Sequence, residues 1–257
     1  MKVMVMDYDV IIIGATFTAT GLLRKYSDRC LVIERRPQAG YEFLNALKFG
    51  TDYDKQLETD EAKALCEKFA EKNAFCGENI CLFDCAGSFY SLLEGKNVLL
   101  NMEIVSVEKN EEGFTVTAHG VSGYRTFTAK KVIDTTIHED MIKAKTLNFI
   151  VNTDKENPAP LSSDLKTEKW GYEEDTLIKC TVNVNDGYIE ARRILTDLIK
   201  TLPSDYKVAL VADCFDYEVK SGYPIEKGGI VFMPSCAYKN PLLAFDAGVL
   251  YAKGGAL

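Results

Sequence analysis

The chain lacks the excess of positive charge that a nucleic-acid-binding protein needs. Its 257 residues include 30 Lys and Arg against 38 Asp and Glu, so the formal net charge is −8. A protein that binds nucleic acid presents a basic face to the phosphates. The pair Arg35 and Arg36 is too short to form such a face. We therefore expect no nucleic-acid partner.

Long hydrophobic runs are also missing. Near the N-terminus the longest apolar run is residues 10–15, far below the roughly 18 residues of a membrane-spanning helix. Asp7 and Asp9 lie where a secretory signal would place its apolar segment. Eight cysteines in such a chain are typical of reduced thiols. The expected location is cytoplasmic, without membrane contact.

The sequence has no pattern that identifies a metal site or a catalytic residue. Cys76, Cys81 and Cys85 do not have the C-x-x-C spacing of a zinc ribbon, so we expect no metal. The chain contains no nucleophile elbow, no metalloprotease motif and no phosphate loop with a lysine. Of the two histidines, His119 is expected to be structural and His138 is a weak candidate for the site. The catalytic residues stay unassigned.

What is present is the composition of a folded globular protein. Apolar residues make up 47% of the chain and charged residues 26%, both within the ordinary range. A length of 257 residues fits one large domain, or one domain that carries a smaller second lobe. A hydrophobic core of useful size can form without disulfides or metals.

The first 34 residues predict a strand, a helix and a second strand. Residues 9–13 form a β-branched apolar run, which is typical of a strand covered on both faces of a parallel sheet. Residues 17–26 carry apolar side chains at helical spacing, and residues 30–33 form a second short strand that ends at Glu34. This order predicts a βαβ unit with a right-handed crossover.

The turn after the first strand has the layout of a dinucleotide site. Gly14 ends the strand, and the N–H groups that follow it, at Ala15, Thr16 and Phe17, favour phosphates. Glu34, 20 residues after Gly14, is placed to accept hydrogen bonds from ribose hydroxyls. Thr16 replaces the middle glycine of the fingerprint, where a positive φ would cost about 1–2 kcal/mol of strain. A βαβ unit without a ligand is the alternative interpretation.

In the order of its elements, the chain resembles FAD-dependent oxidoreductases of the glutathione-reductase-like superfamily. Residues 9–34 are similar to the N-terminal FAD motif, and Arg35 and Arg36 follow its acid as in many members. Residues 101–110, with Ile104 at their centre, look like the strand that meets the adenine. The resemblance implies FAD as the cofactor.

Further cofactor contacts follow from the same resemblance. The strand at residues 130–136 looks like the family strand that ends in Ala-Thr-Gly, which implies Thr135 and Thr136 as contacts. The last helix looks like the one whose start faces the flavin and the pyrophosphate, which implies Asn240, Pro241 and Leu242. Where the chain re-enters the cofactor side of the resembled fold, the implied pocket residues are Tyr41, Asn45 and Lys48.

The chain departs from the family pattern near the expected cofactor. Thr16 and Ile137 stand where the family keeps glycine, and residues 232–236 lack the family's Gly-Asp pair. None of these positions belongs to a core, so the departures predict a retained fold with weakened FAD binding. The chain also has no second nucleotide fingerprint, which leaves no separate NAD(P)H domain.

The remaining periodicity completes the predicted fold. A helix starting at Thr59 or Asp60 follows an irregular stretch. A β-meander comes next, at residues 98–108, 114–119 and 124–130, and a return strand follows at 131–136. The following region has strands at 147–151, 177–182 and 207–212 and one amphipathic helix at 188–202. A strand at 229–234 and a helix at 240–252 come last. The fold class is α/β: a Rossmann-like FAD/NAD(P)-binding domain with a β-meander insertion and a second, smaller α+β lobe. Residues 1–140 plus 227–257 form the first part and residues 141–226 the substrate-side lobe.

Two functions from different classes follow. The first is a FAD-dependent oxidoreductase in which a small-molecule substrate gives a hydride to the flavin. The second is a non-catalytic paralogue that keeps the FAD-binding fold and acts as a binding or accessory protein. A protein that binds NAD alone is disfavoured because of the β-meander. The substrate and the oligomeric state cannot be derived from the sequence, because one fold supports many chemistries.

Overall fold

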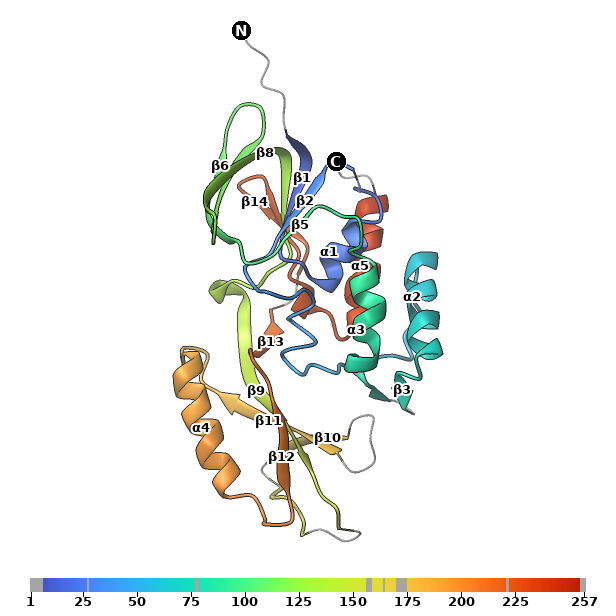
Figure 1. Cartoon of the computed structure of the whole chain (residues 1–257), viewed down its shortest axis with the longest axis vertical. Coiled ribbons are helices and arrows are strands. Elements are labelled where there is room, and N and C mark those ends of the chain that lie inside the picture. Colours follow the sequence, from blue (N-terminus) through green and yellow to red (C-terminus); the bar gives the residue numbers. More distant parts are fainter. Residues whose placement is uncertain are drawn as a thin grey trace.

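Two large β-sheets with helices packed around them make up most of the described chain (Figure 1), and a two-stranded sheet of β3 (Phe75–Cys76) and β4 (Asn79–Ile80) adds to them. The computed structural model describes residues 7–26, 28–76, 79–155, 159–163, 165–169, 175–220 and 222–254. The first sheet holds the N-terminal strand and the second is built from the middle of the chain, as Figure 1 shows at its top and bottom. Across the described residues, no helix combines the length and the apolar character needed to cross a bilayer.

The first sheet has a parallel centre, as the apolar strand patterns predicted. Its order is β14-β15-β8-β1-β2-β5, and every neighbouring pair is parallel except β14 with β15. The bounds are Tyr8–Ile13 for β1, Cys30–Ile33 for β2, Val98–Leu99 for β5, Gly123–Asp134 for β8, Ile225–Lys227 for β14 and Ile230–Phe232 for β15. The expected boundary at residue 226 therefore falls inside a strand of the first sheet.

The predicted β-meander is present, with two differences in its strands. The meander consists of β6 (Glu103–Lys109), β7 (Phe114–Gly120) and β8, paired antiparallel. The expected strand at 98–108 is divided into β5 and β6, because Asn101 between them has a φ of 55° and turns the chain out of the parallel sheet. The expected strands at 124–130 and 131–136 are one continuous strand, β8, which belongs to the meander and to the parallel sheet.

Helices lie on the face of the first sheet that points away from the meander (Figure 1). They are α1 (Phe17–Leu22), α2 (Asp60–Glu71), α3 (Leu82–Ser91) and α5 (Pro241–Lys253). The helices α1 and α5 cross at two glycines: a Cβ on Gly21 would lie 2.1 Å from the Phe245 carbonyl oxygen, and one on Gly248 would lie 2.2 Å from the Thr18 carbonyl oxygen. The close approach therefore requires glycine on both helices.

Local signals predicted some of these helices better than others. Thr59 caps α2 and Asn240 caps α5, as expected, each through its side-chain oxygen. The helix expected at 17–26 ends earlier, at Leu22, and turns follow it. Sequence reasoning missed α3, whose buried side chains occur at helical spacing, at Leu82, Cys85, Ser88 and Phe89.

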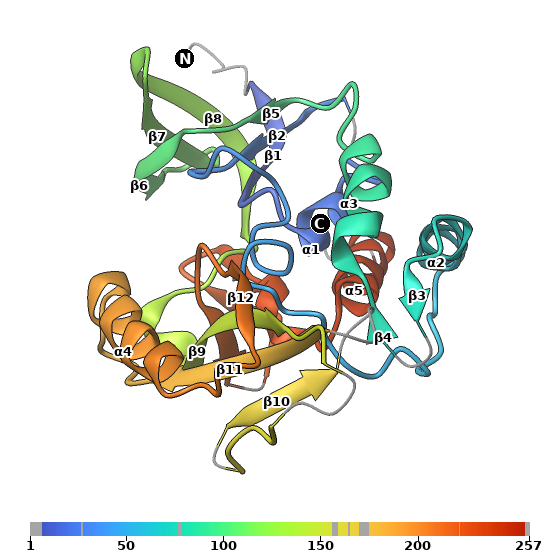
Figure 2. The same cartoon turned by 60° about the horizontal axis from the view of Figure 1, so that its bottom comes forward.

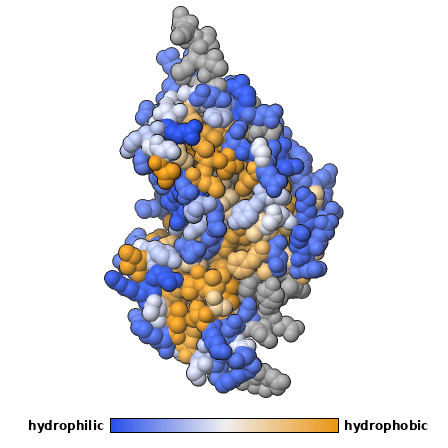
Figure 3. Space-filling model, in the orientation of Figure 1, coloured by the Kyte–Doolittle hydropathy of each residue, from blue (hydrophilic) through white to orange (hydrophobic). Residues whose placement is uncertain are grey.

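The second sheet is antiparallel and centred on β9 (Ile142–Asn152) (Figure 2). Its order is β10-β11-β9-β12, and β13 pairs with the same strand β9. The other bounds are Lys166–Lys169 for β10, Asp175–Val182 for β11, Lys207–Val211 for β12 and Asp216–Val219 for β13. The amphipathic helix α4 (Tyr188–Lys200) packs on it through Ala191 and Leu195. On the exterior, Val208 and Leu210 are exposed, and Figure 3 shows apolar side chains over this lower part.

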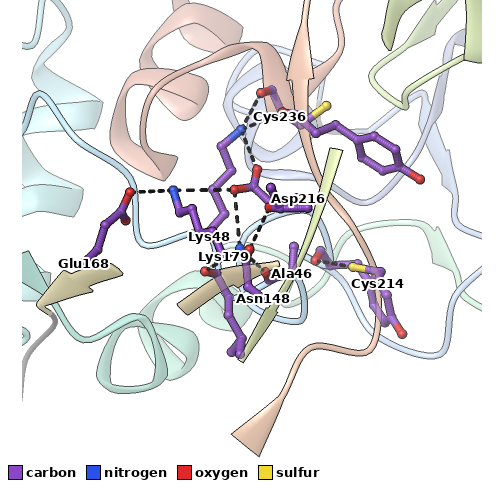
Figure 4. A network of polar contacts seen from close by, with 12 residues as sticks. Ala46, Lys48, Asn148, Glu168, Lys179, Cys214, Asp216 and Cys236 are labelled. Atoms are coloured by element: carbon purple, nitrogen blue, oxygen red, sulfur yellow. Dashed lines mark hydrogen bonds and ion pairs between the residues drawn. The ribbon is translucent and has the colours of Figure 1, made fainter. Parts of the chain in front are cut away.

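A buried lysine joins the two sheets (Figure 4). The Nζ of Lys48, in the irregular segment after β2, donates to the carbonyl oxygens of Tyr217 at 3.1 Å and Cys236 at 2.8 Å. It also lies 3.2 Å from Oδ1 of Asp216 on β13, and the two side chains are only 13% and 11% exposed. Asn148 on β9 adds bonds to the carbonyl oxygens of Ala46 and Leu47. This network fixes the second sheet to the segment that follows β2.

Candidate functional site

A cavity of about 770 Å³ opens at the carboxyl ends of β1, β2 and β8 and reaches the second sheet. In α/β folds this edge of a parallel sheet is where ligands bind, and the volume lies in the range of small-molecule sites. The cavity is lined by Ile13, Gly14, Thr16, Ile33, Glu34, Arg35, Arg36, Tyr41, Glu42, Met102, Glu103, Ile104, Val107, Asp134, Thr135, Thr136, Ile137, His138, Tyr188, Asp213, Cys214, Phe215, Tyr217, Ile230, Phe232 and Cys236. Among the expected cofactor contacts, it brings together Gly14, Thr16, Glu34, Arg35, Arg36, Tyr41, Ile104, Thr135 and Thr136.

The turn after β1 is tightly packed against the end of β8. Gly14 has a φ of +91°, and its N–H donates to the carbonyl oxygen of Ile33 at 2.8 Å. A Cβ at Gly14 would lie 2.6 Å from the methyl carbon of Thr136 and 3.0 Å from Oγ1 of Thr135. Both the backbone conformation and the space therefore require glycine here. The side chain of Thr136 fills the room directly above the turn.

Thr16 is an unstrained helix cap, which corrects the sequence-based expectation. Its φ is −95° and its ψ is 173°, so its backbone is extended and no positive φ is imposed. The Thr16 hydroxyl accepts from the N–H of Ala19 at 3.1 Å and donates to Oγ1 of Thr135 at 2.8 Å. The substitution of the fingerprint glycine by threonine has thus become a capping interaction rather than a source of strain.

Glu34 lies at the end of β2, and its carboxylate faces the same turn. Its Oε2 accepts from the N–H of Ala15 at 2.9 Å and its Oε1 accepts from the N–H of Arg36 at 2.7 Å. The residue is 6% exposed, and this burial raises the pKa of its carboxyl group although both N–H donors and the nearby arginines oppose the shift. Next to it, the Arg36 guanidinium lies 4.5 Å from the ring centre of Tyr41.

A second carboxylate, that of Glu42, lies at the first N–H of α1. Its Oε1 accepts from the N–H of Phe17 at 2.9 Å and from the hydroxyl of Ser235 at 2.8 Å. The side chain is partly buried at the cavity wall, and desolvation raises its pKa to about 7. The neighbouring N–H, of Thr18, donates to Oγ of Ser235 at 3.3 Å. Sequence reasoning missed Glu42, because nothing local distinguishes an acid in an irregular segment.

An aspartate–histidine pair closes the end of β8. Oδ1 of Asp134 accepts from the N–H and the hydroxyl of Thr136 at 2.8 and 2.6 Å. Its Oδ2 lies 2.8 Å from Nε2 of His138. The hydrogen bond to Asp134 raises the pKa of His138, and desolvation of the half-buried ring opposes this effect. His138 can therefore hold a proton at the cavity wall.

The wall on the side of the second sheet is largely aromatic. Phe215 and Tyr217 line it together with the thiol of Cys214 and the acid Asp213. Phe232, on β15 of the first sheet, adds an aromatic ring next to His138. Burial raises the pKa of the Tyr217 hydroxyl and of the Cys214 thiol, so both groups are neutral near pH 7. Such a wall suits an apolar or aromatic small molecule.

The other expected cofactor contacts lie outside the cavity lining. Ala15 contributes its N–H to Glu34, and the Phe17 ring is fully buried, stacked on Phe89. Asn45 bonds to Gln38 and Asp213 at the surface. At the start of α5, the segment Asn240, Pro241 and Leu242 is buried, and the Asn240 amide donates to the carbonyl oxygen of Thr51.

Comparison with solved structures identifies the architecture. No protein-family model and no curated protein matches the chain. AlpK matches with a TM-score of 0.62 at 15% identity, over 98% of this chain and 62% of AlpK. The p-nitrophenol 4-monooxygenase PnpA from Pseudomonas putida DLL-E4 matches at 0.60 and 14%, over 97% and 78%. Aklavinone-11 hydroxylase, solved with FAD and aklavinone, matches at 0.55 and 10%, over 97% and 62%.

The chain shares the fold of these hydroxylases. The shared architecture is mixed α/β with a parallel sheet, as predicted, and one of the matching proteins holds FAD. The chain spans less than two thirds of the length of AlpK and of aklavinone-11 hydroxylase. Among its described residues, no cluster of His, Cys, Asp and Glu is arranged to hold a metal ion.

The residues of the cavity fit FAD at both ends but not in the middle. Glu34 and Ile104 lie at the end next to β2, and the aromatic wall lies at the other end. A dinucleotide fold places the diphosphate at the turn between them. There, the N–H groups of Ala15 and Phe17 already donate to carboxylates of the chain itself. A diphosphate fits this position only once the Glu42 carboxylate has left Phe17.

Proposed function

We propose that the chain is a flavin-dependent oxidoreductase that binds FAD in this cavity and oxidises a small substrate held against the second sheet. The position of the cavity, at the carboxyl ends of β1, β2 and β8 in a fold shared with hydroxylases, carries the proposal. In this proposal residues 1–140 and 227–257, together with the start of β14, would form the cofactor domain, and the rest of residues 141–226 the substrate-side lobe. We also propose that the chain is related to the glutathione-reductase-like superfamily and that it is cytoplasmic.

The chain's own residues would divide the work along the cavity. Glu34 would hold the adenosine ribose through its carboxylate, and Arg35 and Arg36 would supply the positive charge beside it. When bound, FAD supplies the acceptor for a hydride from the substrate. Phe215 and Tyr217 would orient an apolar or aromatic substrate and exclude water from it.

The proton released by such an oxidation needs an acceptor at the cavity wall. His138 is held by Asp134 and lines the cavity. In its neutral form it can accept a proton, and the adjacent carboxylate stabilises the resulting imidazolium. We therefore place His138 as the candidate proton acceptor and Asp134 as the residue that positions it.

A second candidate function is a binding or accessory protein that keeps the fold without a tightly bound cofactor. The specific observation in its favour is the pair of hydrogen bonds that occupies Glu42, from Phe17 and Ser235. In this alternative, the aromatic wall binds a small molecule and no oxidation takes place.

A FAD titration of purified protein tests the first candidate. Loss of a charged acceptor costs about 1.5–3 kcal/mol, so Glu34→Ala should weaken FAD binding about tenfold or more. Glu108→Ala removes an exposed acid of β6 that does not line the cavity and serves as the matched control. Circular dichroism checks that both variants fold. Equal FAD affinity of Glu34→Ala and wild type would contradict the placement of the ribose at Glu34.

A further inference from the structure

We infer that Glu42 acts as an internal competitor of the cofactor: its carboxylate holds the diphosphate position of the cavity, and FAD binds only by displacing it. The inference rests on the proposed function and concerns the same site. It predicts that the cofactor binds weakly although the residues at both ends of the cavity fit it.

The geometry shows that four N–H groups around the turn are already used. The N–H of Phe17 donates to Glu42, and the N–H of Ala15 donates to Glu34. The next two N–H groups, of Thr18 and Ala19, donate to the hydroxyls of Ser235 and Thr16. A phosphate that approached this turn would find no free N–H among these four.

Hydroxyl and backbone groups hold the Glu42 carboxylate, and no cation does. Within the described part of the chain, Glu42 forms no ion pair with lysine or arginine. The ionisable groups that act on it or respond to it are the Glu34 carboxylate and the thiols of Cys214 and Cys236. The nearby lysine, Lys48, is paired with Asp216. Above about pH 7, where Glu42 is ionised, a diphosphate brought to this place would therefore meet like charge from Glu42 and Glu34.

The room above the turn is restricted as well. The methyl carbon of Thr136 lies where a Cβ on Gly14 would be 2.6 Å away, so the diphosphate cannot move toward β8 to avoid Glu42. The carboxylate has to leave Phe17 before a phosphate oxygen can accept from the same N–H. Because both ligands need the N–H of Phe17, their binding is mutually exclusive.

The test compares FAD affinities, measured by quenching of flavin fluorescence. Glu42→Gln keeps the shape of the side chain and removes its charge, so it should bind FAD about tenfold more tightly than wild type, the scale of one charged hydrogen bond. Ser235→Ala keeps the charge but removes one of the two groups that hold the carboxylate, and it should also bind FAD more tightly. Glu108→Gln removes an exposed acid outside the cavity and should change the affinity less than twofold.

The possible results separate the inference from the proposed function. Tight binding by wild type with no gain in either Glu42→Gln or Ser235→Ala overturns the internal competitor and leaves the oxidoreductase proposal standing. No FAD binding by any of the four proteins, with all of them folded, overturns the oxidoreductase proposal itself. A gain in both site variants but not in Glu108→Gln supports both.

Discussion

Replacing Lys48 by methionine should unfold the junction between the two sheets at a much lower urea concentration. Methionine keeps most of the aliphatic chain but removes the ammonium group that bonds to the carbonyl oxygens of Tyr217 and Cys236. It also leaves the Asp216 carboxylate, whose side chain is only 11% exposed, without its nearest cation. The main cost of the substitution is therefore an uncompensated buried charge rather than lost packing.

The structure sets the size of this effect. Removing one partner of a buried ion pair typically costs about 3–5 kcal/mol. Asp216 keeps two weaker partners, the Asn148 amide at 3.4 Å and the Lys179 ammonium at 3.9 Å. We therefore expect a loss near the lower bound, about 3 kcal/mol of unfolding free energy. Adding Asp216→Asn removes the unpaired charge, so the double variant should be more stable than Lys48→Met alone.

Urea unfolding followed by circular dichroism and by intrinsic fluorescence measures these differences. Lys63→Met is the matched control, because its partner Asp60 is 98% exposed and such pairs contribute less than about 1 kcal/mol. A loss below about 1 kcal/mol for Lys48→Met, or a double variant no more stable than the single one, would refute the role of Lys48 as the buried cation that joins the sheets.

Three further outcomes concern the site. The pKa of Glu42 is raised from 4.5 to about 7, so its stabilising contribution is full below pH 4.5 and is lost as the pH rises through about 7. Glu42→Gln should therefore remove a pH dependence of about 3 kcal/mol in the unfolding free energy measured with urea between pH 4 and 8. An unchanged pH profile would contradict the desolvation of the carboxylate. The pKa of His138 is raised by Asp134, so the contribution of this pair to stability is full below the ordinary pKa near 6.5 and is lost as the pH rises through the folded-state value. Because the side chain is 44% exposed, His138→Gln should cost less than about 1 kcal/mol of unfolding free energy at pH 5.5 and less still at pH 8. A larger cost at pH 8 than at pH 5.5 would contradict the raised pKa. Thr16→Gly should destabilise the fold by about 1 kcal/mol through the lost cap and the lost bond to Thr135, without a gain in FAD affinity; a tenfold gain would show strain that the backbone angles do not contain.

Sequence reasoning succeeded where the determining interactions are local. The β-branched run at residues 9–13 and the apolar run at 30–33 form neighbouring parallel strands, because their own side chains suit a sheet covered on both faces. Thr59 and Asn240 begin helices because their side chains bond to N–H groups three residues on. These signals lie within a few residues of the feature that they predict.

It failed where the partners are distant in the sequence. Glu42 and Ser235 are 193 positions apart, and only the assembled fold brings them to the N–H groups of Phe17 and Thr18. The error at Thr16 has the same origin, because its hydroxyl is satisfied partly by Thr135, 119 positions away. A family pattern describes what a position contacts in relatives, so it could not reveal that the Glu42 carboxylate of this chain accepts from the N–H of Phe17.

The crossing of α1 and α5 has a consequence for how the protein is made. Gly21 leaves the ribosome long before Gly248, against which it packs. At 5–20 residues per second, roughly 10–50 s separate their synthesis. During that time the apolar face of α1 has no partner helix, and the parallel sheet waits for β15 to complete it. The apolar face of α1 is therefore expected to stay exposed until α5 emerges, and truncation within α5 should yield aggregated protein rather than a smaller folded domain.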